Sequence, residues 1–514
     1  MIINKNKEPK KLYKVCVFTS LFWFAAHAFC FFNTMFSHDS LSSLYQKGGN
    51  RWQISLGRFL QPVYRTFRGQ LAAPFLIGML ALLWLSLAVY IIVNVLELES
   101  TASIVLVCGF LATNAAVTLT NATYISWLDM FMLALLLSVL GVYMCRRYRF
   151  GFLFGALCIS LSLALYQSYF AVSVVLFLIV LLKMILDGET AKDVVLSGVK
   201  ALLSLIIGLA LYYIAFQIVL RATGISASAD YNGIADAGDF SGVSLPRLLF
   251  DTYVYPVLYF LDPKTFNKPL SIILTGLIGV LTAAGVVGLV IFKRIKRKNI
   301  AVLAALFALI PFGVNVTYFI SKGMIHALMI FSFFFLYVCA ILITEYYKPG
   351  VGMRETFAKH KTAVALRNTA VAFMAVLLFN NIVYSNQIYL RKALEYQSTL
   401  SVMTRLIDRL EQTEGYEAGE TPVAVIGSIS WSPLSQKRTG FEDVYGTGVG
   451  TNYSISYNGT YRSYFEQILG YPINLVDGET QAALKQRPEV VEMPAFPSAE
   501  SFKFIGDVLV IKTS

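Results

Sequence analysis

Long apolar runs dominate this sequence and leave few folds open to it. The first runs from Leu12 to Asn33 and the second from Leu71 to Leu96, and a helix over either is long enough to cross a hydrocarbon core of about 30 Å. Of the 514 residues, 57% are hydrophobic and only 14% are charged, which is too little polar surface for soluble globular domains of this total length. The sequence therefore predicts a polytopic α-helical membrane protein.

The apolar pattern continues as far as Tyr384. Further runs cover residues 103–120, 127–144, 150–186, 201–220, 271–292, 301–320, 323–346 and 363–384. Residues 150–186 exceed a single crossing of about 20 residues, and a polar and aromatic interruption at Tyr166–Tyr169 divides them into two crossings that meet outside. About eleven transmembrane helices are expected.

Clusters of basic residues indicate the orientation of these helices. By the positive-inside rule the basic segment 1–14 is cytoplasmic, and the clusters at 146–149, 183–200, 293–298 and 348–361 then all fall on the cytoplasmic side. The net charge of +12 thus lies in topology signals between apolar runs, and not in a stripe that would bind nucleic acid.

The composition changes in the last quarter of the chain. A helical apolar period covers residues 390–410, Pro422–Ile429 has the pattern of a short buried strand, and Phe502–Ile511 alternates like a second strand. We therefore divide the chain into a transmembrane domain, residues 1–384, and a small C-terminal extracytoplasmic α/β domain, residues 385–514. Tyrosines of the second domain could stack on the sugars of a polymeric acceptor, although core packing also explains most of them.

Two long external loops are expected, at residues 34–70 and 221–268, and the first concentrates polar side chains. Between Phe36 and Arg58 it contains His38, Asp39, Arg51 and Arg58. Ionisable groups at the mouth of a membrane bundle are costly unless they are used. The expected helix centres are nearly free of charge, which argues against a transport path and favours chemistry at the outer leaflet.

Three short motifs stand in or beside the expected outer loops: His38-Asp39, Gly57-Arg58-Phe59 and Leu165-Tyr166-Gln167-Ser168-Tyr169. Together with the arrangement of apolar runs from Phe36 to about Tyr384, these motifs resemble the GtrII-type polyprenyl-phosphate-dependent glucosyltransferases, which modify bacterial surface polysaccharides. The third position of the Gly-Arg segment is often Trp in that family, and Phe59 keeps an aromatic ring there.

The resemblance implies the GT-C architecture, in which a first external loop carries a catalytic acid. It also implies an enzyme of the bacterial cytoplasmic membrane whose donor is a hexose, usually glucose, on undecaprenyl or another polyprenyl phosphate. The implied acceptor is a cell-surface polysaccharide such as O-antigen or teichoic acid. An inverting single displacement follows from the resemblance and not from residue spacing.

The residues themselves can supply the groups that such a transfer needs. Moving a glycosyl group from a lipid phosphate to a hydroxyl requires a carboxylate to take the acceptor proton and cations to stabilise the charge that grows on the departing phosphate. Asp39 is the candidate catalytic base, and the candidates for the phosphate are Arg58 and Lys322, followed by Arg51. The alternatives are a helix-terminus acid for Asp39 and head-group anchors for the three cations.

Sugar and acceptor contacts are expected from His38, Asp129, Tyr166, Gln167 and Tyr169. An aromatic belt explains the two tyrosines about as well, Asp129 could be an interfacial anchor, and His38 could orient Asp39 or lie in ordinary loop surface. The sequence contains no cluster with the ligand density of a calcium or magnesium site, and all six cysteines lie in or beside apolar runs. We therefore expect a metal-independent transfer without a cofactor.

Two other functions stay open at this point. A lipid-linked oligosaccharide flippase or exporter would move its substrate even when Asp39 is changed to Asn. A non-catalytic component of a surface-polymer assembly complex would tolerate the loss of Asp39, Arg58 and Lys322 without losing surface glycosylation.

Overall fold

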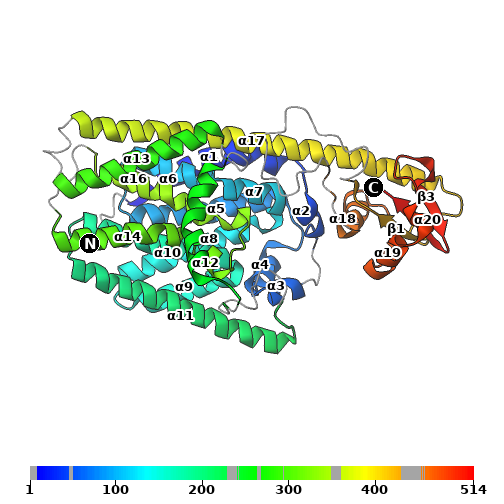
Figure 1. Ribbon diagram of the computed structural model, residues 1–514, viewed down its shortest axis with the longest axis horizontal. Helices are drawn as coiled ribbons and strands as arrows, with labels where there is room; N and C mark the ends of the chain where they lie inside the picture. The colour runs from blue at the N-terminus through cyan, green and yellow to red at the C-terminus, as the bar shows by residue number, and fades with distance from the viewer. Residues whose placement is uncertain are drawn as a thin grey trace.

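The structure is a computed structural model of the chain. It describes residues 8–45, 50–228, 240, 242–262, 268–292, 295–348, 361–429, 453, 455 and 458–514. Helices, short 3-10 or π turns and strands are labelled α, η and β, as in Figure 1.

Eight stretches of the described chain are helical, long and apolar enough to cross a membrane. They are α1 (Glu8–Phe32), α5 (Pro74–Val95), Thr101–Arg147, Gln167–Leu186, α11 (Ala191–Thr223), α13 (Pro269–Phe292), α14 (Arg297–Val314) and α17 (Lys361–Glu411). Shorter apolar helices cover Gly151–Leu165 and Phe331–Glu345. The prediction of a polytopic helical membrane protein is confirmed, whereas the count of eleven crossings stays a prediction.

The stretch Thr101–Arg147 is not one helix. It contains α6 (Thr101–Ala112), α7 (Ala115–Tyr124), the turn η1 (Ile125–Trp127) and α8 (Leu128–Arg147). The predicted run 103–120 is therefore broken near its middle, at Asn114. The side chain of Asn114 accepts a 3.1 Å hydrogen bond from the backbone N–H of Val117 and caps α7, a position that asparagine favours over a helix interior.

The structure also shows where the predicted runs 150–186 and 323–346 are interrupted. As expected, α9 (Gly151–Leu165) and α10 (Phe170–Leu186) are separated, and the turn η2 (Gln167–Tyr169) lies between them. The run 323–346 is regular helix only in its second half, as α16 (Phe335–Glu345), which follows the turns η3 (Ala327–Met329) and η4 (Phe331–Phe334).

The helix α17 joins the predicted last crossing, residues 363–384, to the predicted amphipathic helix, residues 390–410. Neither Gly nor Pro interrupts residues 361–411, so nothing in the sequence ends the helix. Its 51 residues extend for about 75 Å, more than twice a hydrocarbon core of about 30 Å. α17 therefore continues from the bundle to the C-terminal segment (Figure 1).

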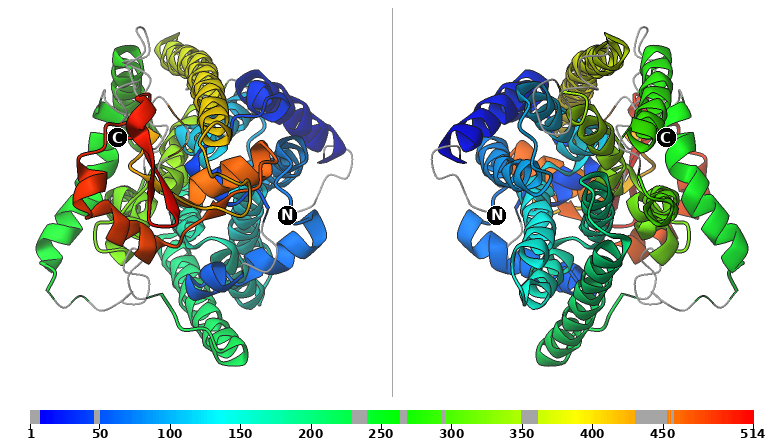
Figure 2. Two further views of the ribbon diagram at one scale, coloured as in Figure 1. Left: turned by 90° about the vertical axis from the view of Figure 1, so that its right-hand side faces the viewer. Right: turned by 90° about the vertical axis from the view of Figure 1, so that its left-hand side faces the viewer.

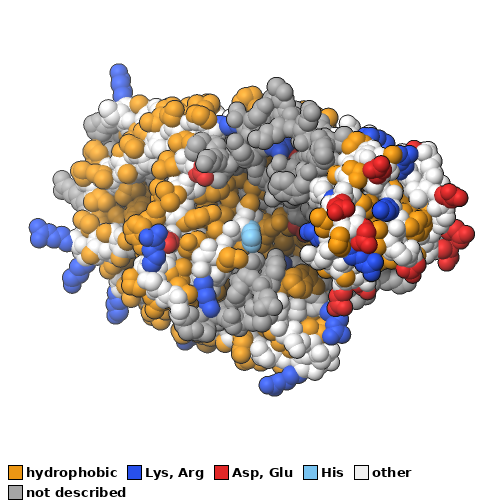
Figure 3. All heavy atoms as spheres, turned by 45° about the vertical axis from the view of Figure 1, so that its right-hand side comes forward, with side chains coloured by type: hydrophobic (Ala, Val, Ile, Leu, Met, Phe, Trp, Pro, Cys, Tyr) orange, Lys and Arg blue, Asp and Glu red, His pale blue; other side chains and the backbone are white. Residues whose placement is uncertain are grey.

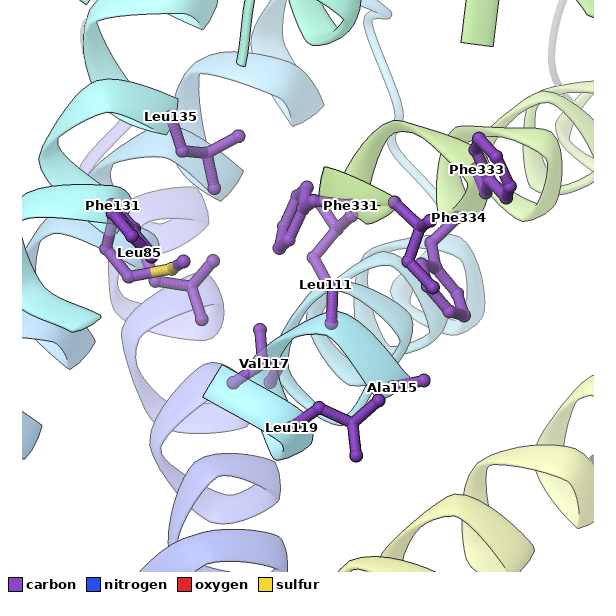
Figure 4. Packing of buried hydrophobic residues seen from close by; sticks show 14 of the residues in the cluster. Leu85, Leu111, Ala115, Val117, Leu119, Phe131, Leu135, Phe331, Phe333 and Phe334 are labelled. Atoms are coloured by element: carbon purple, nitrogen blue, oxygen red, sulfur yellow. The ribbon is translucent and has the colours of Figure 1, made fainter. Parts of the chain in front are cut away.

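Small residues bring the central helices close together. α8 packs along both α5 and α9. A Cβ added to Gly141 of α8 would lie 3.0 Å from the backbone oxygen of Gly155 in α9, and the hydroxyls of Ser138 and Ser162 are 2.8 Å apart across the same interface. Such contacts are typical of membrane helices, which gain little from hydrophobic burial against one another. Figure 4 shows the apolar packing that α5, α6, α7, α8 and η4 add nearby.

The C-terminal segment contains a four-stranded sheet in the order β2-β1-β4-β3. β1 (Pro422–Ile426) pairs in parallel with β2 (Asn474–Leu475) and β4 (Val508–Lys512), and β3 (Phe502–Ile505) pairs antiparallel with β4. The predicted strand Phe502–Ile511 is therefore a hairpin. It turns at Gly506, whose φ of +68° favours glycine.

The two ends of the bundle carry different elements. α1 begins at one end, whereas α2 (His38–Ser42), α3 (Arg51–Ser55), α4 (Leu60–Arg68) and the C-terminal sheet lie toward the other (Figure 1). Viewed end-on, the sheet stands in front of the bundle from one side and behind it from the other (Figure 2). Hydrophobic side chains cover the bundle, and acidic and basic side chains gather over the C-terminal part (Figure 3). We call the end with α2 the loop end and the opposite end the N-terminal end.

Candidate active site

A cavity of about 660 Å³ lies at the loop end. Its walls come from α2, from the segment around α3, from η2, from α11 and from the residues around η3. Among the residues that line it are Asp39, Arg58, Tyr166 and Gln167. Four of the nine side chains expected in the site therefore share one cavity.

The short helix α2 positions Asp39. Ser37 precedes this helix, and its backbone N–H donates a 2.8 Å hydrogen bond to the hydroxyl of Ser40. The hydroxyl of Ser37 donates at 3.0 Å to the backbone oxygen of Thr123, which ties α2 to the end of α7. Asp39 is half-buried in the first turn, where the helix dipole favours an acid. Both the catalytic and the helix-terminus interpretations agree with this position.

A tight turn at Gly57 presents Arg58 to the cavity. Gly57 has a φ of +77°, and the next backbone N–H, of Arg58, donates at 2.8 Å to the carbonyl of Gln53. A Cβ added to Gly57 would lie 2.1 Å from the hydroxyl oxygen of Tyr212 in α11. The backbone conformation therefore favours glycine here, and an added Cβ would have to displace the hydroxyl end of the Tyr212 side chain.

The guanidinium of Arg58 is held by two side chains from the interruption between α9 and α10. Its Cζ lies 4.8 Å from the centre of the Tyr166 ring, and its Nε donates at 3.3 Å to Oε1 of Gln167. The Tyr166 ring in turn stacks on Phe131, with the ring centres 4.1 Å apart. A cation over an aromatic face is attracted to it, so these contacts orient the guanidinium at the cavity wall.

Gln167 connects the first loop to α11. Its Nε2 donates at 2.6 Å to the carbonyl of Leu56 and at 3.0 Å to the hydroxyl of Tyr212. That hydroxyl donates at 3.2 Å to the carbonyl of Gly57. Both donors of the Gln167 amide are used within the protein, so this side chain holds the turn that carries Arg58.

Three other expected site residues, Arg51, Lys322 and Tyr169, do not line the cavity. Arg51 is exposed at the start of α3, and Lys322 is half-buried in a turn with a φ of +55°. Tyr169 is buried, with its ring centre 5.5 Å from that of Phe331, and so belongs to the core. His38 begins α2, and its side chain lies outside the described residues.

Asp129 is buried at the start of α8 and does not line the cavity. Its Oδ1 forms a 3.0 Å ion pair with Nη1 of Arg68, which also donates at 2.8 Å to the carbonyl of Ser126. The pair attaches α4 to α8. We therefore propose a structural role for Asp129 in place of the expected sugar contact.

A second arginine of α4 lies beside this pair. Arg65 is only 2% exposed, its Nη2 donates at 2.9 Å to the side chain of Asn50, and its guanidinium lies 5.5 Å from the ring centre of Trp127. Burial and the charge of Arg68 lower the pKa of Arg65 to about 10, which still leaves it charged at neutral pH. Burial and the nearby charge of Asp129 raise the pKa of Tyr64.

Arg65, Arg68 and Tyr212 were not predicted from the sequence to belong to the site. The sequence does contain one indication of a role for the two arginines: they lie in a loop expected to be external, where the positive-inside rule expects few basic residues. For Tyr212 it contains none, since a single tyrosine within an apolar run has no pattern of its own. Among the described residues, no group of three or more His, Cys, Asp and Glu side chains could hold a metal ion.

The fold and the cavity together define a polytopic membrane protein with a polar, arginine-containing site at one end of its bundle. The chain matches the family model described as Glucosyl transferase GtrII over residues 28–337, which is more than half of its length and includes every residue that lines the cavity. It therefore belongs to the GtrII glucosyltransferase family, and the resemblance seen in its motifs is confirmed. No curated protein and no solved structure matches the chain.

Proposed function

We propose that this glycosyltransferase moves a hexose, usually glucose in its family, from a polyprenyl-phosphate-linked donor to a cell-surface polysaccharide at the outer face of the membrane. The observation that carries the proposal is that a carboxylate, Asp39, and a guanidinium, Arg58, line the same cavity. Family membership supports glycosyl transfer as the reaction. The cavity supports the mechanism, because it contains a carboxylate that could accept a proton and a guanidinium that could bind phosphate.

Asp39 is the proposed general base. Its carboxylate takes the proton of an acceptor hydroxyl as the oxygen of that hydroxyl attacks the anomeric carbon of the hexose. The bond between this carbon and the phosphate oxygen breaks in the same step, and the electron pair leaves with the lipid phosphate. A single displacement of this kind inverts the configuration at the anomeric carbon.

Arg58 is the proposed contact for the departing phosphate. Tyr166 and Gln167 hold its guanidinium before substrate arrives, so little reorganisation is needed when negative charge grows on the leaving oxygen. Lys322 follows Ser321, which lines the cavity, and could add a second positive charge. Arg51 is exposed outside the walls, and we assign it to the lipid head groups.

The hexose is proposed to contact Trp52 and not Tyr166. The indole of Trp52 lines the cavity with the residue 52% exposed, and a sugar ring can pack against such a surface. Tyr166, in contrast, already contacts Phe131 and Arg58 with its ring and is only 2% exposed. The role of Tyr166 is therefore to hold Arg58.

The polymeric acceptor is proposed to approach from the C-terminal segment. α18 (Asn458–Ser463) packs against α2, which carries Asp39. A glycan bound to this segment would therefore meet the proposed base directly. The basic clusters at 146–149 and 183–200 lie where α8 and α10 end and α11 begins, at the N-terminal end of the bundle. By the positive-inside rule this end faces the cytoplasm, so we place the loop end outside the cell.

The test is a transfer assay with the purified full-length protein. Polyprenyl-phosphate-linked glucose, galactose and mannose are each offered with surface glycan, and the hexose incorporated into polymer is measured. The proposal expects transfer of one hexose that requires Asp39. Incorporation at the native rate by Asp39→Asn, or lipid-sugar translocation into vesicles without transfer, would contradict it.

A further inference from the structure

A second cavity, of about 1050 Å³, lies at the N-terminal end of the bundle. The start of α1, the C-terminal ends of α5, α8 and α10, and the chain after α16 form its walls. Cavities that bind small organic molecules have volumes of about 300–1,000 Å³, so this one is large enough for a lipid head group and the first part of its chains. The proposed transfer at the loop end makes no use of it.

Basic residues outnumber acidic residues on its walls by seven to three. Two of the basic residues are neutralised in place. Nζ of Lys183 lies 2.7 Å from Glu97 and 2.5 Å from Asp187, and Nη2 of Arg146 lies 2.9 Å from Glu189. These pairs join the ends of α5, α8 and α10 and leave their cations little attraction for a ligand.

The other basic residues are not neutralised in this way. Within the part of the chain that the structure describes, no ion pair is formed by Lys10, Lys11, Arg147 and Lys348. Nζ of Lys14 donates at 3.0 Å to the hydroxyl of Thr101, and the acid Glu8 accepts a hydrogen bond from Tyr90. Glu8 and Glu99, the other two acids of the wall, offset part of this charge, and the remaining positive charge comes from three segments that are far apart in the sequence.

Apart from Asn94, Tyr90 and Tyr143, the uncharged part of the cavity wall is apolar. Ile91 and Val95 of α5, Ile104 of α6, Leu140 of α8, and Val180 and Met184 of α10 line it. A basic surface next to an apolar surface matches an amphiphile with a negative head group, whereas a free anion would use the basic part alone. We propose that this cavity binds an anionic phospholipid, with its phosphate among Lys11, Arg147 and Lys348 and the start of its acyl chains on the apolar wall.

The test compares lipid binding by two variants of equal net charge. The cavity variant combines Lys11→Gln, Arg147→Gln and Lys348→Gln. The control variant combines Lys192→Gln, Lys200→Gln and Lys298→Gln, all exposed near the same end but outside the cavity. The full-length protein in uncharged detergent is titrated with phosphatidylglycerol, phosphatidylcholine or inorganic phosphate, and bound lipid is counted by native mass spectrometry.

The proposal expects phosphatidylglycerol to bind the native protein and the control variant within about twofold of each other, and the cavity variant at least about tenfold more weakly. Equal losses in both variants would show diffuse charge attraction and overturn it. Binding of phosphatidylcholine with the same affinity, or displacement of the lipid by inorganic phosphate at equal concentration, would also overturn it. If the cavity variant does not fold, Leu140→Trp decides the matter, because it fills the apolar wall without changing charge and must weaken phosphatidylglycerol binding.

Discussion

In the first loop, Asp39 precedes α3 along the chain and Arg58 follows it. Each of the two residues is held by a different part of the bundle. Ser37 attaches the segment before Asp39 to α7, whereas Gln167 and Tyr212 attach the turn before Arg58 to the other side of the cavity. Because the two side chains depend on separate supports, substitutions at each should affect catalysis separately and leave the fold in place.

Asp39→Asn removes the proposed base and keeps the size of the side chain. We expect the rate of hexose transfer to fall by about 10²- to 10⁴-fold, because a general base contributes about that factor. Transfer of labelled hexose and the thermal unfolding temperature are measured together. Asp408→Asn, an exposed acid of α17, is the control and should keep the native rate. A native rate for Asp39→Asn would remove this residue from the mechanism.

Arg58→Lys keeps the positive charge but loses the planar group that lies over Tyr166 and bonds to Gln167. We expect kcat to fall by about 10²- to 10³-fold in Arg58→Gln and by a smaller factor in Arg58→Lys, since preorganised donors to a developing charge have effects of about that size. Steady-state kinetics at varied donor concentration give kcat and KM separately.

Arg51→Gln is the matched control for these arginine variants, because Arg51 has the same charge but is exposed outside the cavity. Its kcat should stay within about twofold of the native value, as exposed substitutions usually have small effects. If Arg51→Gln and Arg58→Gln reduced kcat equally, the cavity would not explain the role of Arg58.

At the scale of elements, the contact between the Gly57 turn and α11 explains how a loop residue is held in place. Gly57→Ala combines the strain of a positive φ, about 1–2 kcal/mol, with a collision of its Cβ against Tyr212. We expect a loss of transfer of more than about tenfold, because displacing catalytic groups by even 1 Å can cost up to about 10²-fold. Transfer rate and unfolding temperature are the measurements.

Gly188→Ala separates backbone strain from the collision. Gly188 has a φ of +91°, but nothing lies within 4 Å of an added Cβ. Its variant should therefore be destabilised by a similar strain and should transfer hexose at close to the native rate per folded molecule. An equal loss of activity in both glycine variants would contradict the proposed contact with Tyr212.

The ion pair between Asp129 and Arg68 makes a prediction about the attachment of α4. Asp129→Asn removes the counter-charge of Arg68, whose side chain is only 3% exposed, and breaking a buried pair in this way costs about 3–5 kcal/mol. The double variant Asp129→Asn with Arg68→Gln should recover part of this loss. Unfolding temperatures of the two single variants and the double variant test the coupling. If Asp129 contacted the sugar instead, Asp129→Asn would raise KM without lowering the unfolding temperature.

At the scale of the whole molecule, the two ends of the bundle are proposed to face opposite sides of the membrane. In a chain whose six cysteines are replaced by serine, Glu479→Cys in α19 (Gly478–Lys485) should react with a membrane-impermeant maleimide on intact cells. Lys298→Cys, at the start of α14, should react only after the membrane is permeabilised. Both positions are exposed, so accessibility within the protein does not decide the outcome. The reverse labelling pattern would invert the proposed orientation.

Much of the molecule could be predicted from local sequence. The apolar runs, the interruption at Tyr166–Tyr169, and β1 were visible as patterns of hydropathy and polarity, and short motifs were enough to indicate the family. Helix boundaries were predicted less well. At Asn114 a side chain caps a new helix within one apolar run. In α17 an apolar segment and a more polar segment form one continuous helix.

The sequence by itself determined that this chain is a membrane protein of the GtrII family with polar side chains in its first loop. Insertion into a bilayer depends on the local density of apolar side chains, which the sequence records directly. Only the tertiary structure decided that Arg58 is held by Gln167 and Tyr166, that Asp129 pairs with Arg68, and that Tyr169 belongs to the core. These are contacts between helices whose spacing and rotation depend on close packing along their whole length, and no local pattern records which faces meet.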